Sequence, residues 1–585
     1  MTTDRFDEAV ALYNKGDAAA ARQILETLVA AAPDHAQAWH LLGVLRSNAG
    51  DKAAARQALE RAVALAPDYV EALCNLGLLL QQQGDLAGAA ERFGRAATLD
   101  PENLAAAEGR AKALWAQERI AEAADPLHRL SRLKPEDRQV AGRLLAALRR
   151  ARRFEEAEAA ARRFVERFPK DSFFLVELGG ILRDRRMPEA ALEVARRAQA
   201  MAPENLDTTI LGAAALSDLE RLEEAAAIFE AVLAQKPDHV DAMANLGGVR
   251  YRLGDPDRAI ESYRRALAQN PRHVSAHWNL SHALLQKGDY RAGWAEYEWR
   301  WKTEKAALIA ERRNFPWPRW DGGPIAGKRL LVHTEQGFGD SIQFLRYVPI
   351  VAKLGAIVTL EVQKELLRLC QSLAGVRMLM PRGLGLSNID LQIPVMSFPH
   401  VLGTTVETIP RNLPYLGADT AAVAAWRERL ADLPRPWIGV CWKGNRKYSA
   451  DHRRSVPAAV VKAMFDSRPA GYVALMKDLE PGELAAAGLD RQVRDISAAL
   501  GDFADTAALV SALDLVITVD TSVGHLAGAL AKPVWLLLPE PADFRWLRGR
   551  SDSPWYPSAR LFRQPVAHDW SAVIAEVIAA LREFR

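Results

Sequence analysis

A polar segment near the C-terminus combines residue types that suit a bound phosphate. The β-branched run Leu515–Val519 is typical of a buried strand, and it is followed by Asp520, Thr521, Ser522, Gly524 and His525. The first three of these are good N-caps for a following helix, and a helix N-terminus favours an anion. We expect a phosphate here, with His525 donating to one of its oxygens. Alternatively, Asp520 only caps the helix and His525 bonds to backbone.

A second loop carries a carboxylate placed as a general base would be. Arg329–Thr334 is expected to be a strand, and the loop after it contains Gly337, Gly339 and Asp340. This order puts the Asp340 carboxylate at the mouth of a cleft, where it can take a proton from a hydroxyl group. Glu335 is the nearest competitor. The structural alternative is that Asp340 is the N-cap of a helix expected from about Ser341.

A third loop supplies positive charge. Trp437–Trp442 is expected to be a strand, and Lys443 and Asn445 follow it in a glycine-containing loop. Lys443 is suited to neutralise a phosphate; the alternative is a loop lysine without a ligand. Four arginines fit a phosphate or a sugar carboxylate no better than they fit a solvated surface: Arg453, Arg454, Arg545 and Arg548.

The C-terminal half of the chain contains no Asp-x-Asp sequence, the pattern of carboxylates that would suggest a metal site. The only Asp-x-Asp sequence, Asp255-Pro-Asp257, lies in a turn between expected helices. We therefore expect no metal site and no resident cofactor.

Strands and helices alternate through the C-terminal half, which predicts parallel sheets. A first lobe spans residues 328–432 and a second spans 433–585. Other strands are expected at Ala356–Val362, Val376–Met380, Ile389–Pro394 and Gly471–Met476, and helices at Lys364–Ser372, Ser455–Asp466, Thr506–Leu513 and Val566–Phe584. Two such lobes leave a cleft between the carboxyl ends of their strands, where open α/β sheets bind ligands.

The N-terminal half repeats every 34 residues. Prolines mark the period at Pro33, Pro67, Pro101, Pro135, Pro169, Pro203, Pro237 and Pro271. This period is that of the tetratricopeptide repeat, a helix pair. We place eight repeats and a degenerate ninth within residues 1–307, stacked into an α-solenoid with a long concave face.

Small residues keep the phase of the repeat. Alanine recurs at one position of the second helix in all eight repeats, from Ala21 to Ala259. Glycine recurs at one position of the first helix, at Gly43, Gly77, Gly179 and Gly247, where close helix packing is expected. Gly-Asp pairs begin at Gly16, Gly50, Gly84, Gly254 and Gly288, where a left-handed glycine should end the first helix.

Two features suggest what the repeats do. Asn75, Asn245 and Asn279 share a position expected to face the groove, whereas other residue types fill it elsewhere. Residues 308–327 form a Pro- and Trp-rich junction, and the aromatic residues around it are expected to dock the last repeat onto the first lobe. A chain that begins near Gly322 is then expected to bind nucleotide without modifying an acceptor.

The three loops together resemble the heptosyltransferase-like GT-B glycosyltransferases. Gly337-Phe-Gly-Asp340 is similar to the loop that carries their proposed base, and Cys441-Trp-Lys443-Gly-Asn445 to a segment that reaches the donor phosphates. Asp520–His525 is similar to their nucleotide-sugar loop. The resemblance covers residues 328–585 and implies two Rossmann-like lobes and transfer of a sugar from a nucleotide sugar as co-substrate, by an inverting, metal-independent reaction.

Joined to repeats, such a domain resembles protein-modifying transferases. O-linked N-acetylglucosamine transferases have an asparagine ladder that holds an extended protein substrate, and the bacterial flagellin-glycosylating transferases use CMP-activated sugars. The resemblance implies transfer to Ser/Thr hydroxyls of a protein acceptor held in the repeat groove, with flagellin as one candidate. A glycan or lipid acceptor, or a scaffold without turnover, are the alternatives. The nucleotide, CMP, UDP, GDP or ADP, stays open.

Length, net charge and cysteine content limit the number of domains, the partners and the compartment that we expect. The chain has 585 residues, too many for one core, and a net charge of only +3, which gives no case for nucleic-acid binding. Its three cysteines, Cys74, Cys370 and Cys441, have no metal spacing, as in a reducing compartment. The chain begins without a signal-peptide pattern and has no apolar run of membrane-spanning length. We expect a cytoplasmic protein.

Overall fold

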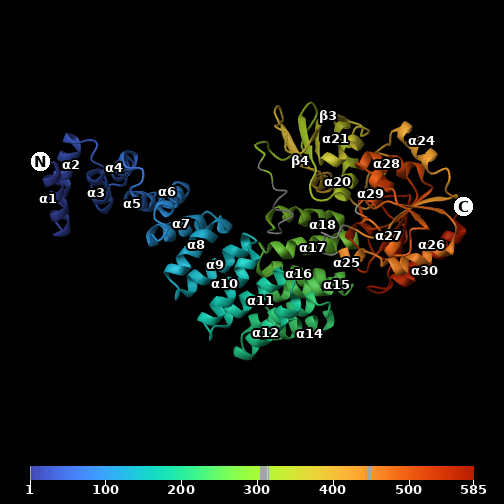
Figure 1. Cartoon of the computed structure of the whole chain (residues 1–585), viewed down its shortest axis with the longest axis horizontal. Helices are drawn as coiled ribbons and strands as arrows, with labels where there is room; N and C mark the ends of the chain where they lie inside the picture. The colour runs from blue at the N-terminus through green and yellow to red at the C-terminus, as the bar shows by residue number, and fades with distance from the viewer. Residues whose placement is uncertain (1, 304–312, 314, 445–450, 478, 585) are drawn as a thin grey trace. The chain divides into compact units, whose positions relative to one another are not determined.

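The computed structural model describes residues 2–303, 313, 315–444, 451–477 and 479–584. The chain divides into two compact units, Met1–Ile228 and Phe229–Arg585, which Figure 1 shows as blue to teal and as green to red. None of the helices in these described ranges combines the length and apolar character needed to cross a membrane.

Paired helices build the whole first unit. They are α1 (Thr2–Asn14), α2 (Ala18–Ala31), α3 (Ala36–Asn48), α4 (Lys52–Leu65), α5 (Val70–Gln82), α6 (Leu86–Leu99), α7 (Leu104–Ala116), η1 (Ile120–Ala123), α8 (Ala124–Leu133), α9 (Arg138–Arg150), α10 (Phe154–Arg167), α11 (Ser172–Asp184), α12 (Pro188–Met201) and α13 (Leu206–Asp218). The boundary between the units falls within α14 (Leu222–Gln235).

The turn between the two helices of a pair has the same left-handed backbone conformation at each 34-residue step. All five glycines of the Gly-Asp pairs have φ between +79° and +89°, as predicted, and the aspartate after each of Gly16, Gly50 and Gly84 caps the next helix through its side chain. The same phase carries Glu118, Arg152, Arg186 and Glu220, with φ between +58° and +61°. The left-handed turn is therefore imposed by the repeat and not by glycine alone.

Close packing explains the recurring small residues. The phased alanines, Ala21, Ala55, Ala89, Ala123, Ala157, Ala191, Ala225 and Ala259, are fully buried. A Cβ at Gly43 would lie 2.6 Å from Leu59, and one at Gly247 would lie 2.6 Å from Tyr263. In both cases the neighbour is the second helix of the same repeat, as predicted.

The second unit contains the last repeats and both sheets. The repeat helices are α15 (Val240–Arg252), α16 (Pro256–Gln269), α17 (Val274–Lys287), α18 (Tyr290–Tyr297) and η2 (Glu298–Lys302). The first sheet contains β1 (Arg329–His333), β2 (Ile357–Val362), β3 (Val376–Pro381) and β4 (Leu391–Pro394). Its helical segments are α20 (Phe338–Phe344), η3 (Leu345–Tyr347), α21 (Val348–Lys353), η4 (Lys364–Leu366), α22 (Leu367–Cys370), η5 (Val395–Ser397) and α23 (Phe398–Val401).

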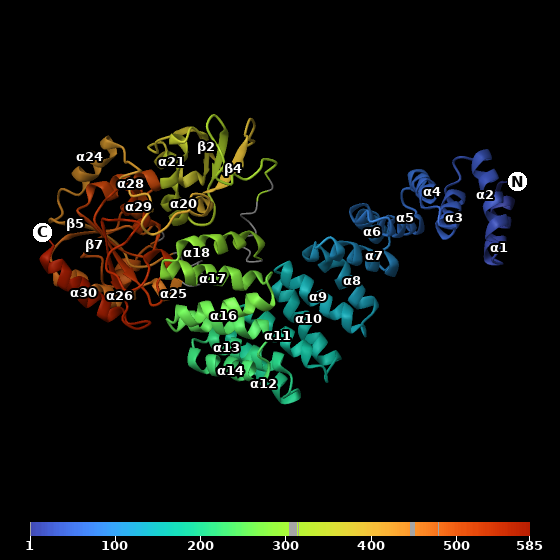
Figure 2. The ribbon, with the colours of Figure 1, turned by 180° about the vertical axis from the view of Figure 1, so that it is seen from behind.

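The second sheet contains β5 (Trp437–Cys441), β6 (Gly471–Ala474), β7 (Val493–Arg494), β8 (Leu515–Val519), β9 (Val534–Leu538) and β10 (Ala559–Arg563). Its helical segments are α24 (Thr420–Arg429), α25 (Asp451–Arg454), α26 (Ala458–Ser467), α27 (Glu483–Ala486), η6 (Ser497–Ala499), α28 (Phe503–Ala512), α29 (Ser522–Ala529), η7 (Phe544–Trp546) and α30 (Trp570–Glu583). Figures 1 and 2 show α28 and α29 on one side of this sheet and α26 and α30 on the other.

Both sheets are parallel, which confirms the predicted α/β class. The strand order is β3-β2-β1-β4 in the first and β10-β9-β8-β5-β6-β7 in the second. Numbered within its lobe, the second order is that of a dinucleotide-binding Rossmann sheet. The order reverses between β1 and β4 and again between β5 and β8, and crevices at such points bind ligands in open α/β sheets.

Some predicted element boundaries are wrong. The terminal helix begins at Trp570, because Asp569 accepts a hydrogen bond from the Ala572 N–H and caps it there. The helix predicted from Ser455 begins after Pro457, whose ring is tolerated only at a helix start. The helix predicted over residues 364–372 consists of η4 followed by the short α22.

Candidate functional site

The structure brings the Asp340 loop and the His525 loop together. They lead into α20, from the first sheet, and α29, from the second. At Gly339, an added Cβ would lie only 2.8 Å from the His525 ring, so glycine is needed for this approach. The two loops that the sequence singled out therefore share one site within the second unit.

Asp340 occupies a different helix position from the one expected. The helix begins at Phe338, so Gly337 is the N-cap and Asp340 is the third helical residue. Asp340 Oδ2 accepts a hydrogen bond from the Gly337 N–H at 3.0 Å, the carboxylate half of a capping box. The expectation that Asp340 is itself the N-cap is wrong, because the two glycines allow the helix to start earlier.

Arg545 is the principal partner of Asp340. Its guanidinium donates to Asp340 Oδ1, to Gln343 Oε1 at 2.6 Å and to Asp543 Oδ1 at 2.9 Å. Burial raises the pKa of Asp340, and the positive charge of Arg545 only partly offsets this. Burial also opposes ionisation of Asp543, but Arg545 holds its pKa below the usual range. One guanidinium thus links two carboxylates of different acidity.

Asp543 was not found from the sequence. It lies in the loop after β9, the strand next to β8, so it reaches the same edge of the sheet as Asp520. The available signal was position alone: a polar residue after the fifth strand of the lobe. Arg545 belongs to this cluster, whereas Arg548 is exposed and pairs with Glu540 at 3.1 Å.

His525 is buried and neutral. Its Nδ1 lies 3.0 Å from the Tyr556 hydroxyl, and its Nε2 lies 3.9 Å from Asp520 Oδ1. The ring stacks on Trp546 with centroids 5.5 Å apart. Burial lowers the pKa of His525 to about 3, and the charge of Arg545 adds to the effect. Among the described residues, the His525 ring bonds to the side chain of Tyr556, so the alternative of a ring bonded to backbone is wrong.

Asp520 directly follows β8 and lies beside this cluster. Burial raises its pKa to about 6, and the nearby charge of Asp543 acts in the same direction. Arg454 donates to the Asp520 carbonyl at 2.7 Å and to Asp451 at 2.9 Å. The main chain after β8 is thus held by an arginine whose own charge is paired.

The N-terminus of α29 has no side-chain cap. Thr521 is the N-cap residue, but its hydroxyl lies 3.0 Å from the Thr518 hydroxyl and does not accept from the helix. Among the described residues, no hydrogen bond engages the backbone N–H of Ser522 or Val523. Gly524 lets this turn approach the sheet, since a Cβ there would lie 2.7 Å from Leu536. Two adjacent main-chain donors remain for an anion.

Lys443 and Asn445 follow β5, next to β8 at the reversal point of the second sheet. Lys443 is mostly buried, and its ammonium pairs with Glu483. Asn445 lies outside the described residues. The charge expected for a phosphate is therefore held by a carboxylate of the protein in this state.

The Glu335 carboxylate is occupied by hydrogen bonds to residues outside the Asp340 cluster. It accepts two hydrogen bonds from Arg300, each of 2.8 Å, and one from the Met396 N–H at 3.2 Å. Arg300 comes from η2, at the end of the repeats, and also donates to Ser397. Glu335 therefore joins the last repeat to the first sheet, which leaves Asp340 as the better placed base candidate.

The three repeat asparagines differ in their surroundings. Asn75, in the first unit, lies 2.7 Å from His40 Nε2 and is half-buried. Asn245 is exposed and Asn279 is half-buried, and within the described part of the chain neither side chain makes a hydrogen bond. Asn245 and Asn279, in the second unit, are thus the two whose side-chain amides are not engaged by the described residues.

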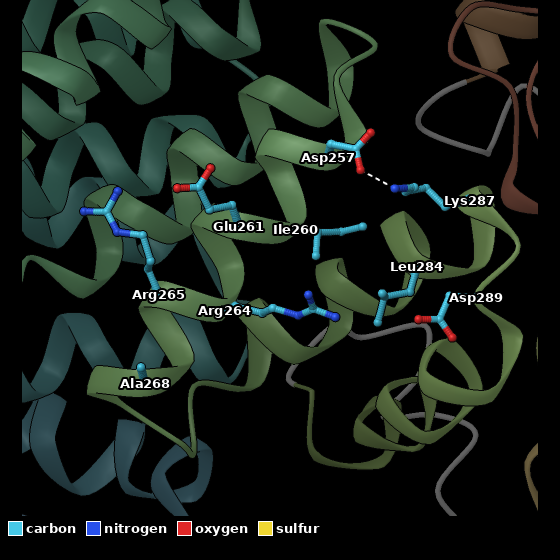
Figure 3. A pocket seen from close by; sticks show the side chains of 9 residues that line it. All are labelled: Asp257, Ile260, Glu261, Arg264, Arg265, Ala268, Leu284, Lys287 and Asp289. Carbon is cyan, nitrogen blue, oxygen red and sulfur yellow. Dashed lines mark hydrogen bonds and ion pairs between the residues drawn. The ribbon is translucent and has the colours of Figure 1, made fainter.

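A hollow of about 610 Å³ lies between α16 and α17 (Figure 3), and none of the residues of this cluster lines it. Its rim carries Asp257, Glu261, Asp289, Arg264, Arg265 and Lys287. Asp257 and Lys287 form an ion pair. Because the two signs of charge balance, the hollow does not select a charged ligand.

Comparisons with known proteins agree with the repeats. A tetratricopeptide-repeat family model matches residues 6–70, 74–138, 144–205, 211–261 and 246–297. The chain is 30% identical to Protein FlbA of Caulobacter vibrioides over 328 residues, 52% of this chain and 54% of that protein. The chain thus spans about half the length of this curated relative.

Solved structures resemble parts of the chain. One is Naa15/Naa10 bound to HypK-THB, with 18% identity, a TM-score of 0.36, and coverage of 53% of this chain and 51% of that one. Another is YrrB, a tetratricopeptide-repeat protein with an unusual peptide-binding site, with 21% identity, a TM-score of 0.21, and coverage of 38% and 96%. From the family match and the helix pairs together, the N-terminal part of this chain, residues 6–297, consists of tetratricopeptide repeats, a protein-interaction scaffold.

Proposed function

We propose that the protein is a glycosyltransferase that moves a sugar from a nucleotide-sugar donor to Ser/Thr hydroxyls of a protein acceptor. The observation that carries the proposal is the pairing of two groups at one site. The uncapped N-terminus of α29 offers main-chain donors for a phosphate, and Asp340, from the opposite sheet, offers a carboxylate of raised pKa. The Rossmann order of the second sheet supports the donor side, and the two lobes would act as a GT-B pair.

The proposed reaction is a single displacement. The acceptor oxygen forms a bond to the anomeric carbon while the bond from that carbon to the phosphate oxygen breaks. The acceptor proton goes to the carboxylate of Asp340, whose pKa is raised by burial, the direction that makes a carboxylate a stronger base. The departing phosphate takes the electron pair and is stabilised by the N–H groups of Ser522 and Val523. Configuration at the sugar is inverted, and no metal ion has a role.

The repeats are proposed to hold the acceptor. Their concave face is the usual binding surface of such arrays, and Asn245 and Asn279, in the second unit with the cluster, have side chains open to a peptide backbone. Flagellin is one candidate acceptor, on the sequence resemblance alone.

The donor site can be tested by removing one N–H group. Thr521 has φ −136° and ψ 172°, which a following proline tolerates. Ser522→Pro, at the first position of α29, should therefore preserve the helix while deleting a donor to the phosphate. Ser522→Ala is the matched control that keeps the N–H. We expect proline to weaken nucleotide binding roughly tenfold or more, measured by thermal shift with CMP, UDP, GDP and ADP in turn. Equal affinity in both variants would place the nucleotide elsewhere.

The base can be tested against a carboxylate that shares its arginine. Asp340→Asn should reduce transfer by roughly 10²–10⁴-fold. Asparagine has one acceptor oxygen, so it cannot serve both the Gly337 N–H and Arg545, and some stability is lost as well. Asp543→Asn also removes a negative charge that is paired with Arg545, and it controls for the loss of stability. If both variants transfer sugar equally well, Asp340 is not the base.

A scaffold without turnover is the second candidate. It is favoured by one observation, that Lys443 and Asp340 both have protein partners in this state. Release of donor nucleotide on addition of an acceptor separates the two, since a scaffold would bind nucleotide and never release it as product. A glycan or lipid acceptor would show the same release with a non-protein substrate.

A further inference from the structure

We propose that Tyr556 and Arg346 are positioning residues that fix His525 as the neutral imidazole with its proton on Nε2. Neither residue belongs to the loops that the sequence singled out. The inference concerns the state of the free protein. Only its consequence for transfer rests on the proposed function.

Tyr556 can meet only one edge of the histidine ring. Its hydroxyl lies 3.0 Å from His525 Nδ1. The phenol is fully buried, and it packs so closely on α29 that a Cβ at Gly528 would lie 2.3 Å from its ring. The contact between the hydroxyl and Nδ1 is therefore held by packing and does not depend on a flexible side chain.

Arg346 sets the direction of the hydrogen bonds around this phenol. Its buried guanidinium donates to the carbonyl oxygens of Gln343 and Trp555, each at 2.8 Å, and lies 4.8 Å from the Tyr556 ring centroid. Its partners in the described structure are carbonyl and phenol oxygens, and an arginine can only donate. Oxygens next to it therefore act as acceptors towards it.

The neighbouring contacts indicate where the hydroxyl protons of Tyr415 and Tyr556 lie. Tyr415 lies 3.4 Å from Arg346 and gives its own proton to the Ile342 carbonyl at 3.0 Å. Burial raises the pKa of Tyr556 well above 10, so its hydroxyl keeps a proton. Tyr415 and Arg346 also interact with this hydroxyl, but the contact at hydrogen-bond distance is His525 Nδ1, 3.0 Å away. The proton is assigned to that contact, which makes Nδ1 the acceptor and leaves the ring proton on Nε2.

The Nε2–H group then points into the proposed site. Nε2 lies 3.9 Å from Asp520 Oδ1, on the side where Gly339 of the other loop passes. The charged groups that act on the ring are Arg545, Asp543, Arg346 and Asp520, and the ring stays neutral among them. If the proposed function holds, this N–H donates to the phosphate as it departs and supplies no proton of its own.

The test reads the tautomer directly. In full-length protein with ¹⁵N-labelled imidazoles, a long-range ¹H–¹⁵N spectrum distinguishes the two ring nitrogens, and His525→Gln assigns the signal. We expect a proton on Nε2 and none on Nδ1 from pH 5 to 8. Tyr556→Phe should lose this preference and give a mixture of tautomers. Tyr472→Phe is the control: this buried phenol donates to the Arg468 carbonyl at 3.1 Å and should leave His525 unchanged.

Each outcome has a defined meaning. A proton on Nδ1, or a charged ring near pH 6, in the unaltered protein overturns the inference even if Tyr556→Phe does not fold. A wild-type tautomer in folded Tyr556→Phe overturns the positioning role. Where the tautomer shifts as expected, nucleotide release tests the separate question: a roughly tenfold fall in transfer supports the consequence, and its absence counts against the proposed function while the tautomer assignment stands.

Discussion

The same repeat is used in two ways in the two units. In the first unit the helix pairs bury alanine, aliphatic and phenylalanine side chains in clusters of their own. In the second, Trp278, Tyr290, Trp294 and Tyr297 belong to one buried cluster that continues into both sheets. The last repeat is therefore part of the core of the α/β region, and a repeat boundary is not a domain boundary here.

The ion pairs of the two units also differ, in how far they are buried. In the first, Arg183 and Asp218 of successive repeats form a half-exposed ion pair at 2.6 Å. In the second, Arg300 and Glu335 pair at 2.8 Å with almost no exposure of either side chain. Exposed pairs contribute little to stability, whereas breaking a buried pair leaves a charge without solvent.

The largest expected effect on folding comes from the residue at which an N-terminally truncated chain begins. The sequence suggested that a chain beginning near Gly322 would still bind nucleotide, and the structure changes that expectation. Such a chain loses Tyr290, Trp294, Tyr297 and Arg300, all buried against the sheets. We expect it to be aggregated or unfolded by circular dichroism, while a chain beginning at Leu222, which keeps α14 whole, folds. A cooperative melting transition in the shorter chain would contradict the shared core.

The next effect compares the two ion pairs. Arg300→Met should destabilise the second unit by about 3–5 kcal/mol, since Glu335 and Glu298 lose their buried partner. Arg183→Ala should cost the first unit no more than about 1 kcal/mol. Calorimetric transitions of the full chain measure both. Equal shifts would mean that the Arg300 pair is not tied into the core.

The sequence predicted the repeats far better than the site. The 34-residue period fixed the helix pairs and their left-handed turns, because packing and backbone geometry recur at each step. The three candidate loops were recognised because each follows an apolar strand, and the structure brings two of them, those of Asp340 and His525, together. Asp543, Tyr556 and Arg346 were missed, since they reach the cluster through tertiary packing that leaves no local pattern. The early start of α20 was missed because Gly337 and Gly339 look like a loop.

A pH-dependent effect of opposite sign should distinguish carboxylates of the two units. Asp520, with a folded pKa of about 6, takes up a proton on folding, so its contribution to stability is full below about pH 4 and is lost as the pH rises through 6. Asp520→Asn should therefore gain stability relative to the parent between pH 4 and 7, by about 3 kcal/mol at most. In the first unit, Arg138 lowers the pKa of Asp171, so that carboxylate stabilises at neutral pH and its contribution is lost as the pH falls. Melting temperatures relative to the parent should be measured from about pH 2 to 7. The value for Asp520→Asn should rise as the pH goes from about 4 to 7, whereas the loss in Asp171→Asn should shrink as the pH falls below about 4. A flat curve for Asp520→Asn would contradict the burial of Asp520.

The smallest effect probes the left-handed turn with and without a neighbour. At Gly84, φ is +82° and a Cβ would meet nothing within 4 Å. Gly84→Ala should therefore cost only the backbone strain of a left-handed residue, about 1–2 kcal/mol. At Gly254, φ is +79° and a Cβ would lie 3.2 Å from Arg548, which donates to the Gly254 carbonyl at 2.6 Å. Gly254→Ala should introduce the same backbone strain and also displace the contact of Arg548 with this turn. The melting temperature of the second unit in Gly254→Ala should therefore fall further than that of the first unit in Gly84→Ala. The double variant Gly254→Ala, Arg548→Ala separates the two terms, because without the arginine the alanine should cost what it costs at Gly84. If the two single variants shift their transitions equally, the repeat turn of the second unit is as independent of the α/β region as the turns of the first.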